Sequence, residues 1–292
     1  MQRRWMKIVV LAVAVMTACS TAKTTKTNTG PTPAENLGTI IAGTITIGTD
    51  MPYAPFESLD TKGNPIGFDV EIFDEVARRL GYKTQWNNAV FDTIFTALQT
   101  KWDIVVSAVT GYAPPGSSAA QTVADRAKIV TFGLPYYSSL QSLAVNKTKT
   151  PDIKSVDDLK SGDRVAVQLG TTGQFWAKQH LESKGISLVG FAKAPDMFLA
   201  LDAGSVKGVV NDLPVSQDAV KGKSDLQVVQ QIETGEQYAY AFAKKKSSTL
   251  RDAVNAQLQK MFKDGTYARI FKKWFPDQEL PSYASASASP SP

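Results

Sequence analysis

The stretch GTDMPYAPFES (residues 48–58) places a carboxylate and an aromatic ring where a predicted strand stops. The Thr/Ile-rich residues 44–48 read as that strand, and prolines flank Tyr53 just after Asp50. Proline fixes one backbone torsion, so both side chains start from a pre-set geometry. Strand ends are where α/β proteins hold ligands. The stretch therefore predicts a binding position, although Asp50 could also cap the turn before Pro52 and Tyr53 could pack in the core.

Two further segments carry polar groups at predicted strand ends. LGTTGQF (169–175) lies between a strand and a helix, where free N–H groups and two hydroxyls form a site for a carboxylate. Thr-Thr-Gly is also an ordinary helix cap. Asp212 ends the strand GVVND and suits pairing with a cation, or equally the capping of a helix that starts near Pro214.

Signals for enzymes and metal sites are missing from the sequence. His180 is the only histidine, lies in the polar stretch AKQHLESK, and is expected to face solvent. With one histidine and one cysteine, no zinc site is predicted. There is no GxGxxG, GxxxxGK[ST] or GxSxG motif. We therefore expect a protein that holds a ligand, with no catalytic residue, cofactor or metal.

The elements that must position these residues alternate between strands and helices. Ser155 with Asp158 resembles a capping box, and a new unit is expected to begin near residues 142–147. Alternation of this kind predicts mostly parallel sheets with helices on both faces. Beyond 44–48, strands are expected at 102–109, 130–139, 164–168, 187–191, 208–212 and 238–243, and helices at 70–82, 91–100, 174–185, 196–204, from 214, 248–265 and 266–275.

The N-terminal segment reads as an export signal. MQRRWMK is basic, and residues 8–18 are apolar but too short to span a bilayer. Met16-Thr17-Ala18-Cys19 resembles a bacterial lipobox, which would place a lipid on Cys19; an ordinary signal peptide or a buried thiol are the alternatives. A single cysteine excludes an intramolecular disulfide. Loss of the leader lowers the formal net charge from +5 to +2, which argues against a nucleic-acid partner.

Seven segments together resemble the extracellular solute-binding proteins of the polar amino-acid type, family 3, which serve ABC importers. They span residues 44–276 in the family's order, and each is weak alone. The resemblance implies an α/β, two-lobe periplasmic-binding-protein type II fold, with mostly parallel sheets flanked by helices and two crossover strands as the hinge. The segments are GTDMPYAPFE, GNPIGFDVEIFDEVARRLGYK, FDTIFTALQTKWDIVVSAVT, TVADRAKIVTFGLPYY, SVDDLKSGDRVAVQLGTTG, GVVNDLPV and DGTYARIFKKWF.

The resemblance also implies a division of the chain. Hinges are expected near 140–142 and 237–239. The expected parts are a signal peptide at 1–18, the lipidated cysteine and a flexible tether at 19–43, lobe one at 44–141 plus 239–280, lobe two at 142–238, and a disordered tail at 281–292.

The same resemblance assigns ligand contacts residue by residue. Arg126 would grip the α-carboxylate of an amino acid, with Thr171 and Thr172 assisting from lobe two, and Asp212 would receive the α-ammonium. The lobe-one contacts would be Asp50, Tyr53, Phe91, Ser107, Ala108 and Thr110.

Two features depart from the family pattern. Residues 111–125 are longer than the usual link, contain Pro114-Pro115-Gly116, and are expected to form a surface excursion that could misalign Arg126. Lys207 stands where an acidic residue is common in the family.

The function that the resemblance implies is capture by lobe closure of a polar or basic amino acid, of the glutamine, lysine or arginine type, and delivery to an ABC permease. Asp50 suits either a distal cation or a polar amide. The protein would be a monomer held by the lipid on Cys19 at the outer face of the cell membrane. The alternatives are a sensing module without transport, or a dehydratase on the same scaffold.

Overall fold

The computed structural model describes residues 35–244 and 247–284. The predicted leader, Cys19 and most of the predicted tether and tail lie outside these residues. The described part is α/β, and its main sheet has nine strands. Eight of them follow the order β4-β1-β5-β11-β7-β10-β8-β9, while β6 pairs with β11.

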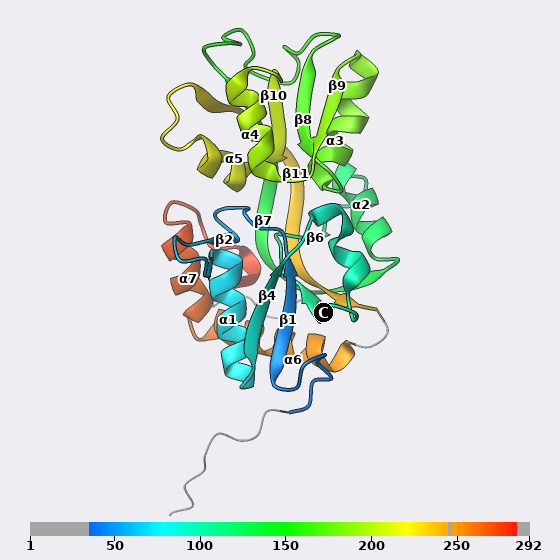
Figure 1. Cartoon of the computed structure of the whole chain (residues 1–292), viewed down its shortest axis with the longest axis vertical. Helices are drawn as coiled ribbons and strands as arrows, with labels where there is room; N and C mark the ends of the chain where they lie inside the picture. The colour runs from blue at the N-terminus through cyan, green and yellow to red at the C-terminus, as the bar shows by residue number, and fades with distance from the viewer. Residues whose placement is uncertain (1–34, 245–246, 285–292) are drawn as a thin grey trace, which may run out of the picture. The chain divides into compact units, whose positions relative to one another are not determined.

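The first group of strands is β1, β4 and β5, and Asp50 and Tyr53 directly follow β1. β1 (Thr44–Thr49) pairs in parallel with β4 (Lys83–Asn88) and with β5 (Ile104–Val105). Five of the six β1 residues are buried because the strand is central and covered. Helices α1 (Phe68–Leu80), α6 (Ser248–Lys263) and α7 (Thr266–Trp274) pack with one another beside it (Figure 1).

The second group holds the residues predicted to act from lobe two. β8 (Arg164–Gln168) pairs in parallel with β9 (Ser187–Phe191) and with β10 (Gly208–Asp212). These strands contact α3 and α4, and α5 contacts β10. The helices are α3 (Thr172–Leu181), α4 (Ala194–Ala203) and α5 (Leu213–Val220).

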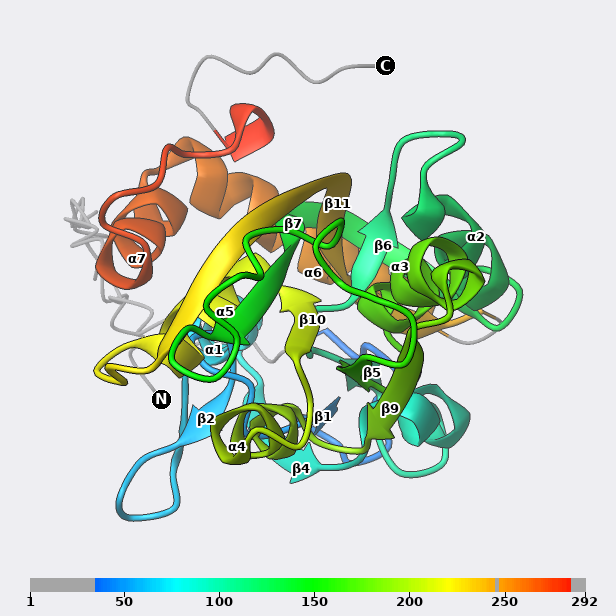
Figure 2. The ribbon, with the colours of Figure 1, turned by 90° about the horizontal axis from the view of Figure 1, so that it is seen from above.

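Two long antiparallel strands join the two groups. β7 (Val130–Asn146) pairs with β11 (Leu226–Ala243), and both views show them side by side (Figures 1 and 2). β11 pairs with β5 near one end, and β7 pairs with β10 near the other. One strand therefore runs through most of 142–147, where the sequence analysis expected a new unit to begin. Its polar middle, SSLQS, hides the continuity in the sequence.

Short elements complete the described part. β2 (Ser58–Leu59) and β3 (Pro65–Ile66) form a hairpin. β6 (Thr110–Tyr112) is followed by α2 (Ser118–Arg126), which the sequence analysis did not predict. The 3₁₀ segments are η1 (Phe91–Ala97), η2 (Glu182–Lys184) and η3 (Ser282–Ala284).

Three local predictions were wrong for identifiable reasons. The helix at 91–100 is a 3₁₀ segment that ends before Gln99, whose φ is 66°. The strand at 102–109 pairs within the main sheet only at 104–105 and cannot extend through Ala108, whose φ is 44°. Asp158 does accept from the N–H of Ser155 at 2.9 Å, but no helix follows because the chain turns again within a few residues.

Three C-terminal aromatic residues, Tyr267, Phe271 and Phe275, pack in the core. Tyr267 and Phe271 are fully buried and contact Phe68 edge-on at 6.0 and 5.9 Å between ring centroids. Phe275 adds a further contact to Phe68 at 5.2 Å. Within residues 35–244 and 247–284, no helix has the length and apolar character needed to cross a membrane.

Candidate ligand-binding site

A single cavity collects every predicted contact residue. Its volume is about 20 Å³, which is close to the space of a single water molecule. The structure brings all ten predicted side chains together there and adds Gln168, which was not predicted. The lining residues are Asp50, Tyr53, Phe91, Ser107, Ala108, Thr110, Arg126, Gln168, Thr171, Thr172 and Asp212.

Arg126 is a buried cation at the last residue of α2. It is 6% exposed, and its guanidinium lies over the rings of Phe91 and Phe95, 5.3 and 5.6 Å from their centroids. Nη1 donates to the carbonyl of Thr110 at 2.9 Å. Burial lowers the pKa of Arg126 to about 10, so the side chain stays charged at neutral pH. In the described part of the chain no carboxylate forms an ion pair with it.

Residues 111–125 include most of the helix that carries Arg126. The turn at Pro114-Pro115-Gly116 leads into α2, which contacts α3 (Figure 2). The expected surface excursion is therefore mostly helical, and it delivers Arg126 to the cavity instead of displacing it.

Gly170 receives the second guanidinium contact. Nη2 of Arg126 donates to its carbonyl at 3.1 Å. The glycine has a φ of 78°, and a Cβ there would lie 2.8 Å from the Cα of Asp92. Both the backbone conformation and the close approach therefore require glycine at this position.

Asp212 presents a buried carboxylate from the end of β10. It is 7% exposed and accepts from the hydroxyls of Tyr53, at 2.8 Å, and Tyr238, and from the side-chain amide of Gln141. Burial, followed by the charge of Glu236, raises the pKa of Asp212 to about 6. It occupies the N-cap position of α5, but its side chain makes no capping bond. All three of its side-chain donors are neutral, so it can accept a cation.

Two polar residues in this network were missed by the sequence analysis. Glu236, 1% exposed, accepts from the hydroxyls of Thr110 at 2.6 Å and Thr172 at 2.7 Å. Gln141 donates to Glu236 at 3.1 Å as well as to Asp212. Both lie in polar stretches of the long strands, where no motif marked them. We call these connected residues the Arg126 network: Arg126, Thr110, Glu236, Thr172, Gln141, Asp212, Tyr53 and Tyr238.

The hydroxyls of the predicted Thr-Thr pair are already engaged by the protein. Thr171 is the N-cap of α3, where its hydroxyl accepts from the N–H of Gln174 at 3.1 Å and donates to the carbonyl of Gln168 at 2.8 Å. The hydroxyl of Thr172 donates to Glu236. The N–H of Gln174 is thus already bonded, whereas the N–H groups of Thr172 and Gly173, the first two of α3, have no partner within the helix and suit an anion.

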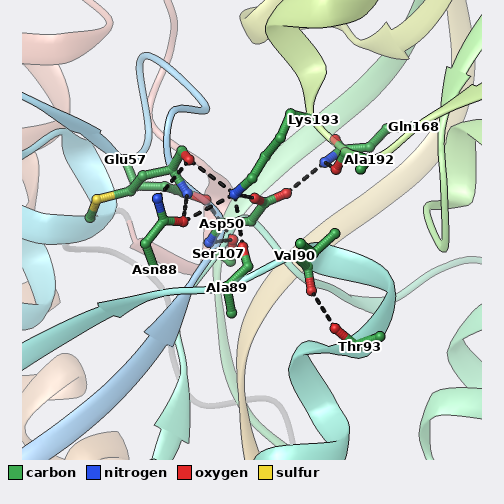
Figure 3. A network of polar contacts seen from close by, with 11 residues as sticks. Asp50, Glu57, Asn88, Ala89, Val90, Thr93, Ser107, Gln168, Ala192 and Lys193 are labelled. Carbon is green, nitrogen blue, oxygen red and sulfur yellow. Dashed lines mark hydrogen bonds and ion pairs between the residues drawn. The ribbon is translucent and has the colours of Figure 1, made fainter.

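Asp50 anchors a second set of contacts (Figure 3). Its carboxylate is 3% exposed and forms an ion pair with Lys193, while the side-chain amide of Gln168 donates to it at 2.6 Å. Burial raises the pKa of Asp50, and the contacts with Lys193 and Gln168 oppose that rise. We call Asp50, Lys193, Gln168 and Asn88 the Asp50 network. Lys193 was not predicted, because it lies in an ordinary helix-start sequence.

The segment between β5 and β6 is held in an unusual conformation by a buried carboxylate. The N–H of Ala108, whose φ is 44°, donates to Asp69 at 3.0 Å, and the hydroxyl of Tyr136 donates to the same oxygen at 2.7 Å. Burial raises the pKa of Asp69 to about 6. Ser107 accepts from the N–H of Asp50 and donates to Glu57 at 2.7 Å. These contacts fix the backbone groups that line the cavity.

Over 35–244 and 247–284, no group of histidine, cysteine and carboxylate side chains could hold a metal ion. His180 is exposed, as expected, and stacks on Trp176 with 4.5 Å between the ring centroids.

Comparison with known proteins identifies what this arrangement resembles. The sequence model of the bacterial extracellular solute-binding proteins, family 3, matches residues 45–277. A probable histidine-binding protein of Neisseria gonorrhoeae is 31% identical over 248 residues, which cover 83% of this chain and 85% of that protein.

Two solved structures of ancestral proteins are similar to most of this chain. An ancestral arginine-binding protein bound to arginine is 34% identical with a TM-score of 0.71, covering 80% of this chain and 98% of that one. An ancestral amino acid-binding protein that is a precursor of cyclohexadienyl dehydratase is 35% identical with a TM-score of 0.70, covering 80% and 96%.

Proposed function

The chain belongs to the bacterial extracellular solute-binding proteins of family 3, and from this we propose that it captures a polar or basic amino acid for an ABC importer. The family is extracytoplasmic, and the fold is its two-lobe periplasmic-binding-protein type. A relative that is named for histidine and a neighbour bound to arginine support an amino acid as the ligand.

One observation carries the proposal: a buried guanidinium and a buried carboxylate, neither ion-paired within the described residues, line the same small cavity. An amino acid has the complementary pair of charges. Its carboxylate would take the planar fork of Arg126 in charge-assisted bonds, and its ammonium would meet Asp212. Burial of these charges is expensive unless both are matched, so the site selects a dipolar ligand.

We further propose that capture works by closure of the two predicted lobes, residues 44–141 plus 239–280 and residues 142–238. Contacts of both networks join residues of the two predicted lobes. Tyr53 donates to Asp212, Arg126 to the carbonyl of Gly170, and Gln168 to Asp50. β7 and β11 would flex as the hinge, since they alone run through both groups of strands in the described part of the chain.

We infer that the chain is not an enzyme. The similar ancestral protein is described as an amino acid-binding protein and as a precursor of a dehydratase, which makes dehydration the specific alternative. Turnover of prephenate or arogenate by the purified protein would establish that alternative and contradict the proposal that the chain is not an enzyme. A sensing role without transport is distinguished by whether deletion abolishes uptake of the ligand.

Anchoring through a lipid on Cys19 is part of the proposal and lies outside the described residues. Fatty-acid labelling that disappears in Cys19→Ser would support it, and labelling that persists would exclude it. The expected partners are the membrane subunits of an ABC permease, and we expect the protein to bind them as a monomer.

The test of the proposed function is a thermal-shift screen of the wild-type protein against the twenty amino acids. A ligand at one hundred times its dissociation constant stabilises the folded state by about 2.7 kcal/mol, which is readily measured. We expect at least one polar or basic amino acid to give such a shift. Absence of a shift with all twenty would contradict the proposal.

A further inference from the structure

The ion pair between Asp50 and Lys193 differs from the other ion pairs of the described residues. Its carboxylate is 3% exposed, whereas the carboxylates of the others are at least 18% exposed. The pair also lies at the cavity, since Asp50 lines it. A buried, paired carboxylate in a ligand site bears directly on which ligand side chains the site accepts.

Lys193 is held by several acceptors that all belong to predicted lobe one. Beside Asp50, its ammonium donates to Asn88 Oδ1 at 3.0 Å and to the carbonyls of Ala89 at 2.9 Å and Met51 at 3.1 Å (Figure 3). Lys193 itself is the N-cap residue of α4, in predicted lobe two. The ammonium therefore has its full set of partners and spans the two lobes.

The remaining acceptor capacity of Asp50 is also occupied. Its other oxygen receives the amide of Gln168 at 2.6 Å, and the backbone N–H of Phe91 also opposes the rise in the pKa of Asp50. Glu57 lies nearby, but burial raises its pKa well above the ordinary value, which favours the neutral acid. The Asp50 network thus combines one negative and one positive charge that satisfy each other.

We infer that Lys193 neutralises Asp50 in the closed protein and thereby makes the site selective for an amino acid with an uncharged polar side chain. The inference rests on the proposed function, because the Arg126 network must hold the charged groups common to all amino acids. The rest of the ligand then meets the Asp50 network through Asp50 and Gln168, which line the same cavity.

A cationic ligand side chain would have to displace Lys193 from Asp50. The lysine is already tethered beside its partner and loses little freedom on pairing, whereas a free ligand must compete with that high effective concentration. An anionic side chain meets the carboxylate of Asp50, while the protons of Lys193 are already donated. Amide and hydroxyl side chains avoid both costs and can exchange hydrogen bonds with Gln168 and the backbone.

Calorimetry with glutamine, arginine, lysine and glutamate on the wild-type protein and on Lys193→Met tests the inference. We expect the wild type to bind glutamine more tightly than the three charged amino acids. In Lys193→Met, Asp50 is left without its cation, and the ratio of arginine affinity to glutamine affinity should rise at least tenfold. Lys193→Arg retains the positive charge and should keep the wild-type preference.

Lys184→Met is the matched control, because Lys184 pairs with the exposed Asp157 and both belong to predicted lobe two. Its binding profile should equal that of the wild type. Tighter binding of a charged amino acid by the wild type, or an unchanged ratio in a folded Lys193→Met, would overturn the inference and leave the proposed function standing. If the wild type binds no amino acid at all, the proposed function itself fails.

Discussion

The Arg126 network and the Asp50 network both contribute residues to one cavity, but they differ in how their buried charges are paired. Arg126 and Asp212 are buried without an ionic partner in the described residues, while Asp50 is paired with Lys193. Leaving a buried charge unpaired is costly, and a folded protein tolerates it where a ligand supplies the counter-charge. The part of the site around Arg126 and Asp212 therefore recognises the charges of a ligand. The part around Asp50 is already neutralised by Lys193.

Removal of either unpaired charge is expected to produce the largest effect on binding. Arg126→Ala or Asp212→Ala leaves one charge of the ligand buried without a partner, which costs about 3–5 kcal/mol, or more than a hundredfold in affinity. Calorimetry on the purified variants measures the loss. Thermal unfolding should show that both variants still fold.

Arg251→Ala is the control for loss of an arginine, because its guanidinium pairs with the neighbouring Asp252 away from the cavity. It should bind like the wild type. Near-wild-type affinity in Arg126→Ala or Asp212→Ala would contradict the view that the Arg126 network, unlike the Asp50 network, recognises the charges of the ligand.

The sequence allowed the unpaired charges to be found, because each follows a recognisable element. Asp212 ends a buried strand, and Arg126 lies in the segment TVADRAK, one of those on which the resemblance to the family was based. Most strands and helices were also predictable from their periodicity. The polar middle of β7 was not, since residues that are polar and buried interrupt the apolar pattern from which strands are recognised.

Protonation of Asp212 gives the second prediction. Its pKa of about 6 in the ligand-free site means that a proton competes with the ammonium of the ligand at lower pH. Affinity should therefore fall about tenfold between pH 7 and pH 5, while the ligand carboxylate stays ionised. Binding at pH 5.5 should release a proton, which calorimetry in two buffers of different ionisation enthalpy detects.

The stability of the ligand-free protein should change in the opposite direction. Because the folded-state pKa of Asp212 is raised, its contribution to stability is fully present below the ordinary pKa and is lost as pH rises through about 6. The pKa of Asp69 is also raised to about 6, so its contribution to stability is likewise lost as the pH rises through that value. Weaker binding at pH 5 therefore cannot be attributed to these groups unfolding the protein. Affinity that is flat from pH 7 to pH 5 would contradict the assignment of Asp212.

The Asp50 network was only half visible in the sequence. Asp50 stood out beside its prolines, but its partner Lys193 lies 143 positions further on, in a segment with no motif. Glu236 and Gln141 were missed for the same reason. Pairing across strands that are far apart in the chain is set by the sheet order, which single-sequence patterns do not contain.

The smallest expected effect on binding is that of Thr171. It tests whether the hydroxyl of Thr171 or the backbone N–H groups of α3 contact the ligand carboxylate. The sequence predicted a contact from this residue to the ligand carboxylate, yet its hydroxyl caps α3 by accepting from Gln174 and donating to Gln168. Thr171→Ala should then cost about 1 kcal/mol of unfolding free energy, through loss of the cap. For a chain of this size that lowers the melting temperature by about 2–4 °C.

Affinity in Thr171→Ala should stay within about threefold of the wild type, because the backbone N–H groups of α3 remain in place to meet the carboxylate. Thr171→Ser keeps the capping oxygen and should restore the melting temperature. A thirtyfold loss of affinity in the alanine variant, recovered in the serine variant, would instead make the hydroxyl itself a ligand contact. In that case the start of α3 binds the ligand carboxylate through a side chain. The Thr171 hydroxyl would then act together with Arg126, in addition to capping the helix.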